Sequence, residues 1–164
     1  MSHKKPKHKI NPVLRKIPNT AEFPLTGKKP RSDPDYLPSS VKDKHPTWRM
    51  SLIDFEGPWG WSNISDIKAL KNIQERLKSF EDMTWGEIEK KLITKGTPQN
   101  HFMSTNKICK AAKDRLKEIN LDDRDTLYSL RFSNVERLWG IREAEVLYIV
   151  WWDHNHSVFP IHHK

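Results

Sequence analysis

The segment that most limits the fold is VLYIVWWD at residues 146–153, which is apolar at odd and even positions alike. Successive side chains of a β-strand point to opposite faces of a sheet, so a strand with this pattern needs cover on both faces. The segment therefore predicts a central strand with packed layers on both of its sides.

Two more strands are expected just before it, over residues 126–132 (TLYSLRF) and 136–142 (ERLWGIR). Turns at SNV and EAE would join the three into an antiparallel meander, and SVF at residues 157–159 suggests a short fourth strand. Alternation along TLYSLRF places its tyrosine, second leucine and phenylalanine on one face and Arg131 on the other. Arg131 should therefore project from the face opposite the main helical core.

Helical patterns occupy the middle of the chain. Residues 65–83 repeat apolar side chains at spacings of three and four, and Ser65 is the expected cap of this amphipathic helix. Its inner stripe consists of Ile67, Leu70, Ile73, Leu77 and Phe80. Thr84 and Glu87 have capping-box spacing, so a second, shorter helix should begin there. A third helix is expected over residues 105–119.

The order of these elements predicts the fold class. A strand at residues 48–55 (WRMSLIDF) would precede two to three helices and then a three- to four-stranded antiparallel sheet. This order predicts a single α+β domain over residues 47–164, with its helices packed against one face of the sheet.

Residues 1–46 differ in composition from the rest of the chain. As far as Thr47 the chain has 11 Lys/Arg and 4 Asp/Glu, a balance of +7, which leaves +1 for the remainder because the whole chain carries +8. Eight of the eleven prolines also lie there, without helical or strand periodicity. We expect a basic, largely disordered arm that can attract phosphate backbones or an acidic protein.

Several classes of protein are excluded by composition. No segment approaches the roughly 20 apolar residues needed to cross a bilayer, and the basic N-terminus lacks the apolar stretch of a signal peptide, so we expect a cytoplasmic protein without membrane contact. With Cys109 as the single cysteine, an intrachain disulfide and a cysteine-based zinc site are excluded.

The closing residues WWDHNHSVFPIHHK hold four of the eight histidines. Histidine suits proton transfer at neutral pH because its ordinary pKa is about 6.5. A metal is the alternative, since His154 and His156 project from the same side if the segment is extended, beside Asp153. A third interpretation is that the histidines are structural and that Asp153 forms a turn by bonding its own backbone.

The segment LYSLRFSNVERLWGIREAEVLYIVWWDHNH resembles the RelE/ParE-like toxin superfamily, whose chains run strand, helical pair and antiparallel meander. The likeness covers roughly residues 48–164 and depends on the LR of the first meander strand, RLWGIR on the second and VLYIVWW on the third. RelE-like members cut messenger RNA, usually in the ribosome, whereas ParE-like members act on gyrase, and a small antitoxin restrains the active ones. The resemblance implies RNA as substrate, no cofactor, and an antitoxin partner.

The resemblance also implies roles for particular residues. Arg131 would hold the scissile phosphate together with Arg137, while a catalytic basic or histidine position follows the third strand. The expected catalytic residues are His154, His156, Arg131, Arg137, His162 and His163, and the expected substrate-binding residues are Trp139, Trp151, Arg142 and Lys164.

The sequence therefore leads first to the hypothesis of a metal-independent, toxin-like endoribonuclease. Arginines would hold the phosphate, histidines would transfer protons, and a tryptophan would stack on an unpaired base. Two alternatives remain open at this point: a non-catalytic module that binds nucleic acid or protein, and a His/Asp metal-dependent hydrolase.

Overall fold

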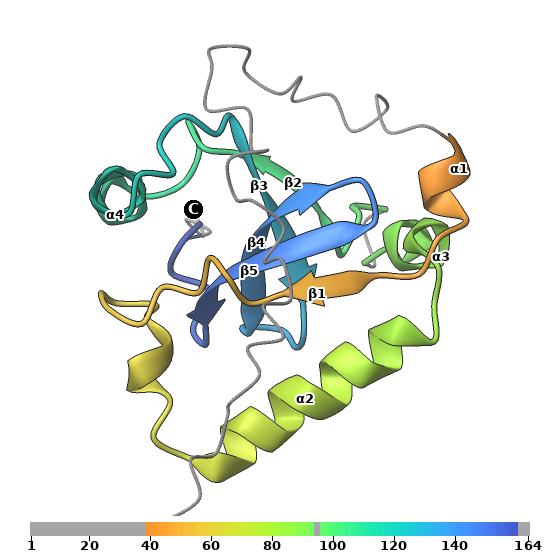
Figure 1. The fold of residues 1–164 in the computed structure, drawn as a ribbon, viewed down its shortest axis with the longest axis horizontal. Helices are drawn as coiled ribbons and strands as arrows, with labels where there is room; N and C mark the ends of the chain where they lie inside the picture. The colour runs from red at the N-terminus through yellow and green to blue at the C-terminus, as the bar shows by residue number, and fades with distance from the viewer. Residues whose placement is uncertain (1–38, 94–95, 161–164) are drawn as a thin grey trace, which may run out of the picture.

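The computed structural model describes residues 39–93 and 96–160, which form an α+β fold (Figure 1). Among these residues, five strands make one sheet in the order β1-β5-β4-β3-β2. The strands are β1 (Thr47–Arg49), β2 (His101–Ser104), β3 (Thr126–Arg131), β4 (Arg137–Glu143) and β5 (Val146–Asp153). The sheet is mixed, since β1 is parallel to β5 and the other neighbours are antiparallel. The expected sheet of three or four purely antiparallel strands is therefore wrong, although the α+β class is confirmed.

Helices cover both faces of the sheet, with α2 and α4 on opposite sides of it (Figure 1). The helices are α1 (Ser39–Lys42), the 3-10 turn η3 (Trp61–Asn63), α2 (Ile67–Glu81), α3 (Trp85–Lys90) and α4 (Lys110–Glu118). A first core joins α2 and α3 to one face, and a second core joins α4 to the other. The prediction of helices on one face alone is therefore wrong. None of the helices among the described residues has the length and apolar character needed to cross a bilayer.

Strand β5 lies inside the sheet, between β1 and β4, and contacts both cores, as its apolar pattern predicts. Leu147 and Ile149 belong to the first core, whereas Val150 and Trp151 belong to the second. A register shift between β4 and β5 leaves Val150 as an extra residue, so two consecutive side chains of β5 reach the same core. Both faces of the strand are buried, which explains why it has no polar position before Asp153.

The helix starts follow local capping chemistry. Thr84 and Glu87 form the predicted capping box, in which each side chain bonds the backbone N–H of the other. Helix α2 begins one residue later than expected, because Asp66 is the cap and accepts the backbone N–H of Lys68. Ser65 therefore lies outside the cap position.

Other boundaries differ from the sequence-based expectation. The strand predicted over residues 48–55 pairs only as far as Arg49, because the chain turns at Ser51 and Leu52. The helix predicted over residues 105–119 is shorter, residues 101–104 before it form β2, and no strand forms at residues 157–159.

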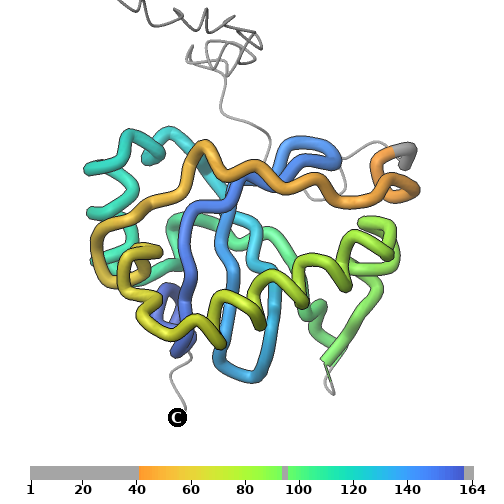
Figure 2. Tube along the Cα trace, turned by 60° about the horizontal axis from the view of Figure 1, so that its bottom comes forward, coloured from red at the N-terminus to blue at the C-terminus, as the bar shows by residue number. Residues whose placement is uncertain are grey.

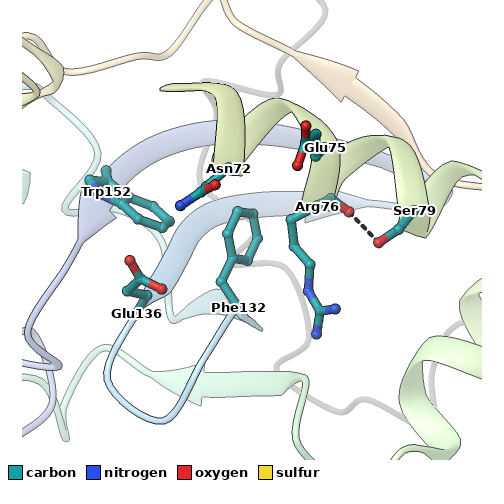
Figure 3. A pocket seen from close by; sticks show the side chains of 7 residues that line it. All are labelled: Asn72, Glu75, Arg76, Ser79, Phe132, Glu136 and Trp152. Atoms are coloured by element: carbon teal, nitrogen blue, oxygen red, sulfur yellow. Dashed lines mark hydrogen bonds between the residues drawn. The ribbon is translucent and has the colours of Figure 1, made fainter. Parts of the chain in front are cut away.

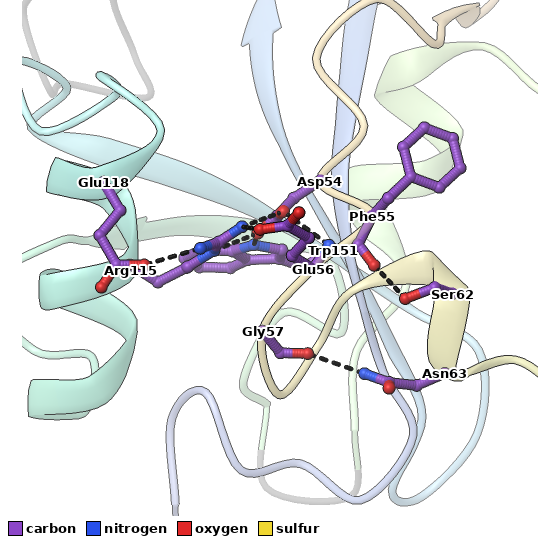
Figure 4. Close-up of polar contacts among 9 residues, drawn as sticks. All are labelled: Asp54, Phe55, Glu56, Gly57, Ser62, Asn63, Arg115, Glu118 and Trp151. Atoms are coloured by element: carbon purple, nitrogen blue, oxygen red, sulfur yellow. Dashed lines mark hydrogen bonds and ion pairs between the residues drawn. The ribbon is translucent and has the colours of Figure 1, made fainter.

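A buried ion pair fixes the chain after this turn (Figure 4). Asp54 accepts hydrogen bonds from Arg115 Nε at 2.8 Å and Nη2 at 2.7 Å, and from the indole N–H of Trp151 at 2.9 Å. Burial opposes ionisation of Asp54, but these hydrogen bonds outweigh it and hold the pKa of the carboxyl below its ordinary value. The loop after β1 is thereby attached to α4 and to the second core.

The predicted arm at residues 1–46 lies outside the described residues as far as residue 38. Within the remainder, α1 precedes β1 and Val41 is buried in the first core. Lys44 pairs with Glu145 at 2.9 Å, and His45 Nδ1 lies 2.8 Å from the carbonyl oxygen of Glu81. Residues 41–46 are thus attached to the domain.

Candidate functional site

The end of the sheet brings Arg131 and Arg137 together. The two are direct partners across the β3–β4 ladder, and Arg137 is also the partner of Asp153 on β5. Partners in an antiparallel ladder project to the same face, so these three side chains form one row across three strands. Trp139, two residues along β4 from Arg137, belongs to the second core, which places the row on the α4 face.

Carbonyl oxygens of the β3–β4 hairpin hold both guanidinium groups. Arg131 donates to the carbonyl oxygen of Ser133 at 3.0 Å and to Asn134 Oδ1 at 2.7 Å. Arg137 donates to the carbonyl oxygens of Ser133 at 2.7 Å and Glu136 at 2.9 Å. Among the described residues, neither arginine forms an ion pair with a carboxylate. The two positive charges are therefore placed side by side, and only the more distant charge of Asp153 favours the charged form of Arg137.

The carboxylate of Asp153, the third residue of the row, is hydrogen-bonded to backbone N–H groups and to an indole N–H. It is fully buried and accepts the N–H groups of Ser157 at 2.9 Å and Val158 at 3.0 Å, and the indole N–H of Trp139 at 3.3 Å. These bonds fold residues 154–158 back over the second core, where Val158 is buried. The turn interpretation of Asp153 is thus the one that the structure shows.

Two half-buried histidines lie within electrostatic range of the arginines. His156 follows the Asp153 turn in a left-handed conformation with φ of 59°, and His101 opens β2 as the partner of Ser129. Burial lowers the pKa of both imidazoles below the ordinary value, and the charge of Arg137 lowers both further. Asp153 offsets only part of this effect at His156. Both histidines are therefore neutral at neutral pH.

The surroundings of Arg137 also lower its own pKa. Burial first, and then the neighbouring charge of Arg131, lowers the pKa of Arg137 to about 10. We call His101, Arg131, Arg137 and His156 the basic cluster. Two guanidinium groups that form no ion pair with a carboxylate of the described residues favour an anion, and planar donors of this kind suit phosphate oxygens. The neutral imidazoles beside them can accept protons.

Other predicted site residues lie outside the basic cluster. His154 is exposed, without a side-chain hydrogen bond or ion pair to the described part of the chain. Trp139 and Trp151 are 1% and 0% exposed in the second core, so neither can stack on a base while the fold is intact. His162, His163 and Lys164 lie outside the described residues.

Arg142 was expected to bind substrate, but it lies on the other face of the sheet. Its buried guanidinium stacks 3.6 Å from the ring centre of Trp85 and pairs with Glu89. This placement follows from alternation, because an odd spacing of five residues separates it from Arg137 within one strand. Arg142 is thus a structural residue of the first core.

Two residues of this region were not expected at the site. The segment PQNHFM predicts a loop in which His101 is structural or exposed, but His101 opens β2 and belongs to the basic cluster. Asn100 is 2% exposed, and its Oδ1 accepts the backbone N–H of Arg131 at 2.7 Å while its Nδ2 donates to the carbonyl oxygen of Ile88 at 3.1 Å. Asn100 therefore ties the end of β3 to α3.

A metal-binding arrangement is not found where the structure can be described. Among residues 39–93 and 96–160, no three His, Cys, Asp or Glu side chains converge as metal ligands. Comparisons of the chain with protein-family models, curated proteins and solved structures gave no match. The chemistry of the basic cluster is thus the main guide to function.

Proposed function

We propose that this protein is a RelE-like endoribonuclease that cleaves RNA without a metal at the basic cluster, acting in the cytoplasm. The observation that carries the proposal is the register pairing of Arg131 with Arg137, two arginines without a carboxylate partner among the described residues, beside two neutral histidines. An RNA phosphodiester supplies the missing negative charge, and its 2′-hydroxyl supplies the proton for a histidine to accept.

The chemistry follows from these groups. The 2′-oxygen attacks phosphorus as its proton passes to one neutral histidine, and the bond from phosphorus to the 5′-oxygen then breaks. The bound phosphate raises the pKa of both imidazoles, so the second histidine can arrive protonated and donate to the leaving 5′-oxygen. Arg131 and Arg137 stabilise the charge that develops on the phosphate oxygens. The products are a 2′,3′-cyclic phosphate and a 5′-hydroxyl.

The likeness to RelE-like toxins supports RNA as the substrate class. Arg131 lies on the first meander strand and Arg137 on the second, as the resemblance implies. The proton-transfer residues differ from those first expected, because His101 joins His156 in the cluster and His154 does not. A small antitoxin that restrains the enzyme is part of the same proposal.

Cleavage in the presence of EDTA tests the proposal. A labelled RNA, free and ribosome-bound, is incubated with the full chain and with three variants, His101→Ala, His156→Ala and His154→Ala. Loss of a positioned acid or base lowers a rate by about 10²–10⁴-fold, so we expect that loss for the first two variants and full activity for the third.

Three outcomes would contradict the proposal. If RNA stays intact both free and on the ribosome, the protein is not an endoribonuclease. RNA that is bound but not cut favours a non-catalytic binding module instead. Cleavage that depends on an added metal ion favours a hydrolase of another class.

A further inference from the structure

A pocket of about 350 Å³ opens on the sheet face opposite the basic cluster, between α2 and the β3–β4 hairpin (Figure 3). Its lining includes Glu75, Arg76, Phe132, Glu136 and Trp152. The start of α2, the hairpin and the end of β5 lie at the same end of the molecule (Figure 2). Cavities of this size accommodate small ligands.

One side of the pocket is aromatic. The rings of Phe132 and Trp152 lie 5.2 Å apart between centroids at 61°, and Phe80 supports Phe132 from below at 6.2 Å. Phe132 is only partly buried, and its ring stands between the α2 side chains and Trp152 in Figure 3. An aromatic ring held by its neighbours in this way provides a stacking surface for a planar base.

Charged side chains surround this aromatic surface, and the guanidinium carbon of Arg76 lies 5.2 Å from the ring centre of Phe80. Among the described residues, the side chains of Glu75, Arg76 and Glu136 form no ion pair, and Arg76 Nε is enclosed without a hydrogen-bond partner. In Figure 3, Glu136 lies beside Trp152, and Arg76 lies on the other side of Phe132. A carboxylate and a guanidinium thus flank the ring from opposite sides.

From this arrangement we propose that the pocket binds a guanine base. Guanine presents two adjacent N–H donors on its Watson–Crick edge, which suit a carboxylate such as Glu136. Its O6 and N7 acceptors suit the guanidinium of Arg76. Adenine has a single exocyclic amino group between two ring acceptors, so it cannot donate two adjacent N–H groups to the carboxylate of Glu136.

As a specificity pocket for RNA, this inference rests on the proposed function. The hairpin connects the two sites, because Phe132 and Glu136 line the pocket while the carbonyl oxygens of Ser133 and Glu136 hold Arg137. Because the two sites lie on opposite faces of the sheet and meet at the hairpin, the pocket would take a guanosine from an RNA strand that passes around the hairpin from the basic cluster. The enzyme would then select RNA that carries a guanosine near the cleaved phosphate.

Calorimetric titration of the full chain with 5′-GMP and with 5′-AMP tests the pocket. The two ligands share ribose and phosphate, so a difference in affinity reports the base. We expect GMP to bind at least tenfold more tightly than AMP, and Glu136→Gln to remove that preference. The matched control is Asp122→Asn, which neutralises an exposed carboxylate outside the pocket and should keep the wild-type preference.

Equal affinities for GMP and AMP, or a GMP preference that survives Glu136→Gln, would overturn the guanine pocket. The cleavage assay separates the two proposals. Cleavage in EDTA without GMP preference leaves the nuclease standing and rejects the pocket. A GMP preference that depends on Glu136, in a protein that does not cut RNA, supports the pocket and rejects the nuclease.

Discussion

Replacing Arg137 by methionine should change folding stability little, although the side chain is buried. Burial and the charge of Arg131 lower the pKa of Arg137 to about 10. Because a tenfold change in proton affinity corresponds to about 1.4 kcal/mol, holding this charge at neutral pH costs about 3 kcal/mol. The hydrogen bonds to the hairpin carbonyl oxygens offset that cost at about 1–3 kcal/mol each. The two effects nearly cancel, so we expect the free energy of unfolding to change by about 1 kcal/mol or less.

Arg142→Met is the matched control, since it removes a buried arginine from the same strand, β4. This guanidinium pairs with Glu89 and stacks on Trp85. Its removal leaves a partly buried carboxylate without a partner, which costs about 3–5 kcal/mol when an ion pair is broken on one side. The two substitutions are chemically identical, so their difference reports the ion pair and the aromatic stacking that Arg142 has and Arg137 lacks.

Urea unfolding measures both variants, with and without inorganic phosphate at constant ionic strength and pH 7. At a hundred times its dissociation constant, a ligand specific for the folded state adds about 2.7 kcal/mol. We expect phosphate to raise the free energy of unfolding of the wild type and of Arg142→Met by more than it raises that of Arg137→Met. The increase seen in Arg137→Met measures the general effect of phosphate as a salt. A loss of about 3 kcal/mol or more in Arg137→Met, together with equal phosphate effects in all three proteins, would refute the reasoning.

Three further substitutions test the packing around the site. Asp54→Asn leaves the guanidinium of Arg115 without its buried acceptor and should cost about 3 kcal/mol by urea unfolding. Because folding lowers the pKa of Asp54, the carboxylate contributes its full stabilisation above the unfolded pKa and loses it as pH falls through the folded pKa. The difference in unfolding free energy between Asp54→Asn and the wild type should therefore shrink below about pH 4. Asn100→Ala removes the acceptor of the Arg131 N–H and should lower RNA cleavage more than it lowers binding of a non-cleavable strand, whereas equal losses would mean that Asn100 only stabilises the fold. Gly140→Ala should cost at least 1–3 kcal/mol in thermal unfolding, because a Cβ there meets a backbone carbonyl of β5.

The C-terminal strands were predictable because each carries a complete local signal. Alternation along β3 separates Tyr128 and Leu130 in the first core from Arg131, and the apolar run of β5 indicates cover on both faces. The shorter β1 and β2 were mispredicted because long-range pairing decides them. The strand pattern of WRMSLIDF continues past Arg49, but a turn at Ser51 and Leu52 interrupts the pairing with β5. The chain returns to β5 at Asp54, whose backbone N–H bonds the carbonyl oxygen of Val150 and whose side chain pairs with α4.

The site was only partly predictable for the same reason. Arg131 and Arg137 followed from the meander, since partners across a hairpin come from neighbouring sequence. His101 comes from a strand thirty residues away, and nothing in PQNHFM indicates which residue it will face. The buried state of Trp139 and Trp151 depends on cover from α4, so strand periodicity could not distinguish a stacking surface from a core.

The most direct test of the basic cluster is the titration of His101 and His156, followed one imidazole at a time by NMR. We expect the pKa of each imidazole to be below the ordinary histidine value of about 6.5 in the free protein. Both values should rise in Arg137→Met, which removes a nearby positive charge, and both should rise when an RNA analogue lacking 2′-hydroxyl groups binds to the wild type. Two pKa values of 6.5 or higher that respond neither to Arg137→Met nor to the bound analogue would contradict the claim that these four residues form a phosphate-binding, proton-transfer site.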